Sequence, residues 1–109
     1  MTMLREAALL RIYTSERRRL DGRPLHEAIV LLAREQGLAG ATVLRGPLGY
    51  GASNRLHTAK ILDLSEDLPL VIEIVDSREK IEAFLPQLTP VLGKGLVTLE
   101  KVQVLTGEE

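Results

Sequence analysis

The hydrophobic and polar positions of the chain first predict a short strand that is apolar on both sides. Residues 6–13 (EAALLRIY) end at a polar run, and their apolar members fall on both parities: Ala7 and Leu9 on one, Ala8, Leu10 and Ile12 on the other. Residues 70–75 repeat this pattern with β-branched side chains, interrupted only by Glu73. Strands of this kind are covered on both faces, so we expect two buried central strands.

Two segments carry apolar residues at helical spacing. The first follows Pro24, stops at Gly37 and places on one stripe Leu25, Ala28, Ile29, Leu32 and Ala33. The second begins at Asp76-Ser77, where Asp76 and Glu79 have the spacing of a capping box. Its apolar face consists of Ile81, Phe84, Leu85, Leu88 and Leu92. Pro86 lies within it, which predicts a kink or a restart of the helix.

The remaining segments predict two more strands and the loops between them. The strands are residues 41–44 and 96–104, and the Gly-Lys-Gly of residues 93–95 predicts a tight loop. The glycine-rich stretch from residue 46 to residue 55 predicts a mobile loop without regular structure. Three short segments are expected to form a hairpin arm, a turn and a polar tail, at residues 60–64, 67–69 and 106–109.

The order of these elements favours an α+β fold. Strand, helix, strand, short arm, strand, helix and strand predict a ferredoxin-like βαββαβ sandwich, with an antiparallel sheet and two helices on one face. We expect residues 1–109 to form a single domain of this kind. The face of the sheet away from the helices would expose apolar side chains such as Leu9 and Val71. Closed self-association is the usual remedy for such a patch.

Composition narrows the function classes. The net charge is −1, so no broad cationic field points to nucleic acid, and three aromatic residues cannot form a platform for stacked bases. The absence of cysteine excludes disulfides, a thiol nucleophile and a thiolate zinc site. No apolar run has the length of a membrane span, and no signal peptide is expected. We therefore expect a cytoplasmic protein without direct membrane insertion.

A few polar residues are candidates for binding or catalysis. Residues 17–19 (Arg-Arg-Arg) are either a solvated turn or a patch that faces phosphate, and both interpretations stay open. Two histidines, His26 and His57, do not suffice for a metal site, and no serine has a base at recognisable spacing, so neither a metal nor an enzyme is expected. Tyr13 is expected to pack, and Glu73 to meet an arginine across a subunit boundary.

The middle of the chain resembles the nitrogen-regulatory PII signalling proteins. Residues 40–43 (GATV), 49–51 (GYG) and 57–58 (HT) are similar to the Gly-Met-Thr-Val, Gly-Phe-Gly and His-Thr of that family. A group of small PII-like proteins, catalogued as a domain of unknown function, is similar over nearly the whole chain. Its pattern is matched by Leu-Arg-Ile-Tyr, Gly-Tyr-Gly, Asp-Leu-Pro and Gly-Leu-Val-Thr at residues 10–13, 49–51, 67–69 and 95–98.

This resemblance implies a homotrimer with inward-packed sheets and an adenine nucleotide in clefts between subunits. It implies that Thr42 lies near the adenine. It further implies that backbone N–H groups approach phosphate at two loops, formed by Gly49, Tyr50 and Gly51 and by Gly93, Lys94 and Gly95. The loop of residues 49–58 would dock on a partner, a membrane transporter or an enzyme, with contacts from Ser53, Asn54, Arg55 and His57.

Departures from the PII pattern bear on which nucleotide fits. Ala52, Leu96, Gln103 and Leu105 stand where PII proteins have cations, and each lost cation removes a charge-assisted hydrogen bond of about 1.5–3 kcal/mol. AMP or ADP is therefore expected as the regulatory ligand rather than ATP, with no other cofactor. Arg45, Lys94 and Lys101 are possible substitutes.

Three functions from different classes are compatible with these features. The first is a regulatory protein whose ligand reorders the docking loop. The second is a constitutive trimeric adaptor without nucleotide binding, of the type associated with divalent-cation tolerance. The third is an enzyme such as an acylphosphatase, which needs an asparagine near the second strand; the only asparagine, Asn54, lies elsewhere. The first is the function we expect.

Overall fold

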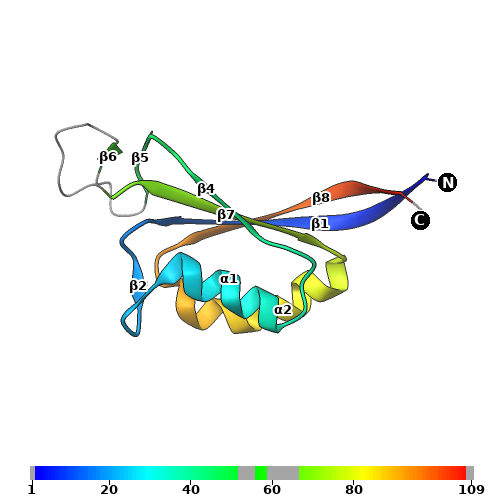
Figure 1. Ribbon diagram of the computed structural model, residues 1–109, viewed down its shortest axis with the longest axis horizontal. Helices are drawn as coiled ribbons and strands as arrows, with labels where there is room; N and C mark the ends of the chain where they lie inside the picture. The colour runs from blue at the N-terminus through cyan, green and yellow to red at the C-terminus, as the bar shows by residue number, and fades with distance from the viewer. Residues whose placement is uncertain (1, 52–55, 59–66, 108–109) are drawn as a thin grey trace.

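The computed structural model describes residues 2–51, 56–58 and 67–107 of the chain (Figure 1). The elements along these residues are β1 (Thr2–Ser15), β2 (Arg19–Leu20), β3 (Arg23–Pro24), α1 (Leu25–Glu35), β4 (Thr42–Arg45), β5 (Leu48–Gly49), β6 (His57–Thr58), β7 (Pro69–Asp76), α2 (Arg78–Leu92) and β8 (Leu96–Gly107). The expected hairpin arm at residues 60–64 lies outside the described residues.

The main sheet has four strands in the order β4-β7-β1-β8, and every neighbouring pair is antiparallel. Both helices cover the same face of this sheet (Figure 1). The two crossover helices join strands that are not neighbours, which gives the βαββαβ arrangement of a ferredoxin-like fold. The predicted fold class is confirmed.

The core lies between the sheet and the helices. Alternate residues of β1 and β7 face the helices and are fully buried, and they meet the apolar stripes of α1 and α2. The members with the least exposure are Ala8, Leu10, Ile12, Ile29, Ile72, Ile74, Ile81, Phe84 and Leu88. Aliphatic packing thus supplies the core almost alone, with Phe84 as its one fully buried ring among the described residues.

The second helix begins differently from the prediction. Its N-cap is Ser77, whose side chain accepts a hydrogen bond from the Lys80 amide at 3.3 Å. Asp76 is the last residue of β7, and its carboxylate instead accepts hydrogen bonds from the amides of Ala39 and Ser77 at 2.9 and 2.7 Å. The predicted capping box of Asp76 and Glu79 is therefore wrong, because Asp76 joins the end of β7 to the loop before β4.

Pro86 does not restart the helix. Helix α2 continues from Arg78 to Leu92 through both Pro86 and Pro90. Each proline is exposed, so the carbonyl that loses its partner four residues earlier lies where solvent can reach it. The expected restart is therefore wrong, whereas the alternative of a kink at Pro86 stays a prediction. The buried side chains of α2 are Ile81, Phe84 and Leu88.

The two long strands extend beyond the prediction. β1 begins at Thr2 and β8 continues to Gly107, so the first part of the expected polar tail is strand. Residues before Ala8 pair with β8 alone, because β7 ends opposite Ala8. The first residues of β1 and the last residues of β8 therefore pair only with each other, and they form a two-stranded arm that projects from the sheet (Figure 1). Its Leu4 and Leu105 are 63% and 65% exposed, which marks the arm as apolar surface.

The glycine-rich stretch contributes one strand to a short strand pair that was not expected. Leu48 and Gly49 form β5, which pairs antiparallel with His57 and Thr58 of β6. A Cβ on Gly49 would lie 3.2 Å from Cγ of Pro69, so the absent side chain allows the backbone to pass the start of β7 closely. The prediction of no regular structure is wrong at Leu48 and Gly49, and residues 52–55 lie outside the described part.

The face of the sheet without helices carries a mixture of apolar and charged side chains. Leu9, Tyr13, Val71 and Leu44 lie on it by register, since residues directly opposite in a pair share a face. In its centre Arg11 joins two carboxylates, with Nε 2.9 Å from Glu73 and Nη1 2.8 Å from Glu100. The hydrogen bond with Glu73 is the largest influence, and together the two carboxylates raise the pKa of Arg11.

Glu73 has an arginine partner within its own chain. The structure pairs it with Arg11 of the neighbouring strand, and the arginine expected from another subunit stays a prediction. The register places Arg11 directly opposite Glu73, so the strand pairing itself brings the two side chains together.

Candidate functional site

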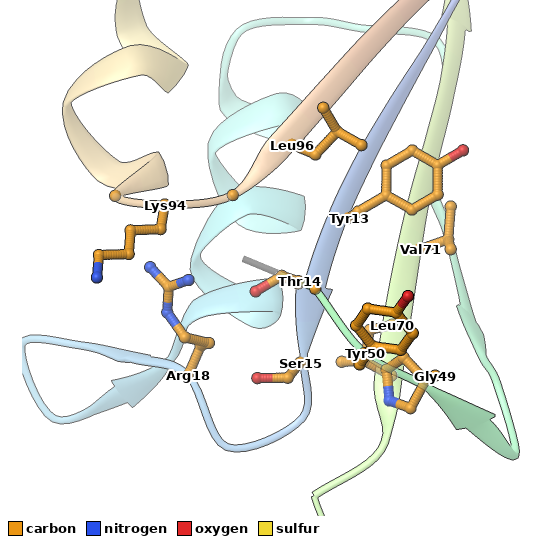
Figure 2. A pocket seen from close by; sticks show the side chains of 14 residues that line it. Tyr13, Thr14, Ser15, Arg18, Gly49, Tyr50, Leu70, Val71, Lys94 and Leu96 are labelled. Atoms are coloured by element: carbon orange, nitrogen blue, oxygen red, sulfur yellow. The ribbon is translucent and has the colours of Figure 1, made fainter. Parts of the chain in front are cut away.

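A cavity of about 1010 Å³ lies where three strands begin or end. The end of β1, the start of β7 and the start of β8 meet there, and β5 closes one side (Figure 2). Its volume is at the upper end of the roughly 300–1,000 Å³ that small-molecule sites occupy. The lining residues are Tyr13, Thr14, Ser15, Arg18, Gly49, Tyr50, Gly51, Pro69, Leu70, Val71, Gly93, Lys94, Gly95 and Leu96.

One wall of the cavity is the tight turn between α2 and β8. Gly93 has φ +59° and ψ −122°, a conformation that side chains rarely adopt. The carbonyl oxygen of Leu92 accepts two hydrogen bonds, from the Gly95 amide and from Nη2 of Arg18, both at 3.0 Å. A Cβ on Gly93 would lie 2.6 Å from that same Nη2 atom. The turn and the Arg18 guanidinium therefore fit against each other.

Cationic and hydroxyl groups gather at one end of the cavity. Arg18 and Lys94 approach this end from opposite elements, and the hydroxyls of Thr14 and Ser15 point to the same side in Figure 2. No carboxylate is among the described lining residues. Oγ1 of Thr14 is buried and has no hydrogen-bond partner in the described part of the chain. This end has the composition of a site for an oxyanion.

The other end of the cavity is apolar. Tyr13, Val71 and Leu96 cluster there on adjacent strands (Figure 2). The register pairs Tyr13 directly with Val71 on one side and with Leu96 on the other, so the three side chains share a face. Tyr50 adds a ring that is 70% exposed. Flat apolar surface of this kind suits an aromatic ring system.

The structure brings together two groups of residues that the sequence singled out. Gly49, Tyr50 and Gly51 lie on one side of the cavity, and Gly93, Lys94 and Gly95 lie on another, although more than forty positions separate them. Their role in ligand binding stays a prediction.

Other predicted residues are placed elsewhere. Thr42 lies on β4 opposite Glu73, on the helix-free face of the sheet and not in the lining of the cavity. His57 belongs to β6. The proposed docking residues Ser53, Asn54 and Arg55 lie outside the described residues.

Several lining residues were missed or left open by the sequence. Arg18 belonged to a run for which a solvated turn and a phosphate-facing patch were both considered, and the structure assigns it alone of the three arginines to the cavity wall. Tyr13 was expected to pack, and Thr14 and Ser15 were only the polar end of a strand. The only indication in the sequence was that polar residues, Thr14 and Ser15, follow directly after the apolar residues of the predicted strand.

The described residues hold no other obvious chemical centre. No three histidine or carboxylate side chains among residues 2–51, 56–58 and 67–107 gather closely enough to hold a metal ion. Within the same residues, no helix is both long and apolar enough to span a membrane.

Comparison with protein families gives one match that spans most of the chain. The DUF190 model, described as "Uncharacterized ACR", matches residues 7–104. A UPF0166 protein of Aquifex aeolicus is 43% identical over 99 residues, which cover 89% of this chain and 91% of that protein. A UPF0166 protein of Methanocaldococcus jannaschii is 35% identical over 104 residues, which cover 94% of this chain and 95% of that protein.

Solved structures of PII-like proteins share this fold. CPII of Thiomonas intermedia, a nitrogen regulatory PII-like protein bound to ADP, AMP and bicarbonate, aligns with a TM-score of 0.72 at 18% identity and covers 94% of this chain and 91% of that chain. A candidate PII-like signalling protein of Thermus thermophilus aligns with a TM-score of 0.66 at 19% identity. The alignment covers 93% of this chain and 91% of that chain. At these identities the likeness establishes the fold.

Proposed function

Because the chain belongs to the DUF190 family and has a PII-like fold, we propose that it is a regulatory protein that binds AMP or ADP in the cavity described above. The observation that carries this proposal is the meeting of the Gly49–Gly51 and Gly93–Gly95 segments around one cavity with a polar and an apolar end. CPII, which has the same fold, is a protein bound to ADP and AMP.

The two ends of the cavity match the two parts of such a ligand. The apolar surface of Tyr13, Val71 and Leu96 offers contact area for an adenine ring. The glycines of both segments leave backbone amides open to close approach, and Arg18 and Lys94 supply two positive charges. Two cations balance one or two phosphate groups better than three, which favours AMP or ADP over ATP.

We propose that the protein acts as a homotrimer. The helix-free face and the projecting arm expose Leu44, Leu4 and Leu105, and a two-stranded arm is marginally stable on its own in water. Packing of sister chains against this face would cover it and would place the cavity at a subunit boundary, since Tyr13, Val71 and Leu96 belong to that same face.

We further propose that the loop of residues 49–58 docks on a partner protein, a membrane transporter or an enzyme. Its first residues contribute Gly49 and Gly51 to the cavity, so a bound ligand would contact the base of this loop. A ligand that binds one arrangement of this base more tightly would shift the population toward it and so change docking.

Isothermal titration of the purified chain with AMP, ADP and ATP tests the proposal. We expect saturable binding of AMP and ADP, weaker binding of ATP, and a melting temperature that rises with ligand concentration. GMP and CMP are matched controls, because they carry the same phosphate with a different base.

A variant at the apolar end tests the position of the site. Val71→Asp places a carboxylate in that end of the cavity, and we expect it to weaken AMP binding by at least about tenfold. The absence of heat and of thermal stabilisation with every nucleotide would contradict nucleotide binding and would favour the constitutive trimeric adaptor.

A further inference from the structure

The polar end of the cavity carries an inference that deepens the proposed function and rests on it in part. We propose that Thr14, Ser15, Arg18 and Lys94 form an oxyanion subsite, and that the Arg18 guanidinium is the principal ligand of a phosphate group bound there. The cation that holds the phosphate then comes from the turn after β1, a segment separate from the glycine-rich stretch before β6.

Charge is the first reason. Arg18 and Lys94 lie at the same end of the cavity in Figure 2, and no carboxylate among the described lining residues neutralises them. The other ion pairs of the described residues, such as Arg45 with Glu16 and Arg78 with Glu82, join cations to acids outside this cavity. Two like charges without a counter-charge attract an anion into the space between them.

The position of the guanidinium is fixed before a ligand arrives. One of its five N–H donors is bonded to the Leu92 carbonyl at 3.0 Å, and the missing Cβ of Gly93 leaves the space that Nη2 occupies. The bond uses one donor and leaves four for a ligand. A cation held in this way loses little conformational entropy when it binds phosphate, which favours affinity.

The hydroxyl groups support the same assignment. Ser15 lines the cavity beside Arg18, and Oγ1 of Thr14 is a buried oxygen without a partner among the described residues. A buried hydroxyl that makes no hydrogen bond lowers the stability of the free protein. A hydroxyl at this position in the cavity wall is explained if a ligand oxygen supplies the missing hydrogen-bond partner. A phosphate offers several acceptor oxygens for such donors.

The experiment compares adenosine, AMP, ADP and pyrophosphate as ligands of the full chain by isothermal titration. In the wild type we expect AMP and ADP to bind more tightly than adenosine. Arg18→Gln retains an N–H donor for Leu92 and loses the charge. We expect this substitution to lower the affinity for AMP and ADP by roughly 10- to 100-fold. Adenosine affinity is expected to stay within about twofold, because adenosine has no phosphate.

The matched control is Arg17→Gln. Arg17 lies in the same turn and loses the same charge, but its side chain does not line the cavity; its backbone amide donates to Asp67 at 2.8 Å, which the substitution retains. We expect its affinities to equal those of the wild type. Arg18→Lys serves as a second variant if Arg18→Gln lowers the melting temperature, and it is expected to keep part of the phosphate affinity.

The outcomes separate this inference from the proposed function. Equal AMP and ADP affinities in Arg18→Gln and the wild type would overturn the subsite and leave nucleotide binding intact. If neither adenosine nor any nucleotide binds, the proposed function fails, and pyrophosphate then decides the subsite alone. Thermal stabilisation of the wild type by pyrophosphate that Arg18→Gln lacks would support it, and equal or absent stabilisation of the two would overturn it.

Discussion

Nη2 of Arg18 donates a hydrogen bond of 3.0 Å to the carbonyl oxygen of Leu92, 74 positions away in the chain. That carbonyl belongs to the last residue of α2, where no intrahelical donor is available, and it also accepts a hydrogen bond from the Gly95 amide. The bond joins the turn after β1 to the turn before β8, which are the two sides of the polar end of the cavity. Structure and ligand recognition therefore depend on the same guanidinium.

The first prediction concerns Gly93→Ala. The substitution places an L-residue at φ +59°, and its Cβ meets Nη2 of Arg18 at 2.6 Å. We expect the free energy of unfolding to fall by about 1–3 kcal/mol from backbone strain, and the displaced guanidinium to weaken AMP binding as well. Urea denaturation measures the first effect and titration the second.

Gly40→Ala is the control for that prediction. Gly40 has no heavy atom within 4 Å of an added Cβ and no positive φ, so its stability is expected to change by less than about 0.5 kcal/mol. An equal effect of the two substitutions would contradict the special role of Gly93.

The second prediction concerns Thr14→Val, which removes a hydroxyl and keeps the shape of the side chain. Because Oγ1 of Thr14 is buried without a partner among the described residues, we expect the free protein to become more stable by about 1 kcal/mol. The affinity for AMP is expected to fall, since the same hydroxyl would bond the phosphate. The melting temperature should therefore rise in thermal melts, while the affinity for AMP measured by titration should fall.

Thr14→Ser is the matched variant, because it keeps the hydroxyl and removes a methyl group. It should bind AMP like the wild type while losing some stability. A loss of stability in Thr14→Val would show that the hydroxyl already has a partner in the free protein.

The periodicity of the sequence was sufficient to predict the sheet and its helices. Leu10 and Ile12 alternate with Leu9, so both faces of β1 were identified as apolar, and the structure buries one face against the helices. The family pattern was equally informative, since it spans residues that the fold brings together, such as Gly49 and Gly95.

The features that were missed depend on partners distant in the sequence. For Arg18 the sequence left a solvated turn and a phosphate-facing patch both open, because nothing near it in the sequence indicates that Leu92 lies within hydrogen-bond distance. Asp76 had the spacing of a cap, but the amide of Ala39 holds its carboxylate at the end of β7. In both cases a tertiary contact outweighs a local signal.

The third prediction concerns the pH dependence of the ion pairs of Arg11. Its pKa is raised in the folded chain, chiefly by the hydrogen bond with Glu73. A cation whose pKa rises on folding stabilises the protein below its unfolded pKa, and this stabilisation is lost only when the pH climbs through the higher folded value. For an arginine that limit lies beyond the range in which the protein can be measured.

We therefore expect Arg11→Gln to lower stability by the same amount at every pH between about 7 and 10. Arg5→Gln is the control on the same strand, because Arg5 has no ion pair among the described residues. Urea denaturation at several pH values measures both variants. A stability difference that shrinks across this range would contradict the assignment.

The last prediction tests whether a sister chain covers the helix-free face. Leu44 lies on that face and is 49% exposed in the single chain, whereas Leu31 lies on the outer surface of α1 and is 39% exposed. Because both side chains are similarly open, replacement by glutamate should cost a monomer little at either position. In a homotrimer only Leu44→Glu places a charge in an apolar interface, where an unpaired carboxylate is costly.

Sedimentation velocity at micromolar concentration should report a particle of three 12.0 kDa chains for the wild type and Leu31→Glu, and a smaller one for Leu44→Glu. A wild-type particle of one chain, or an unchanged Leu44→Glu trimer, would show that this face stays open to solvent.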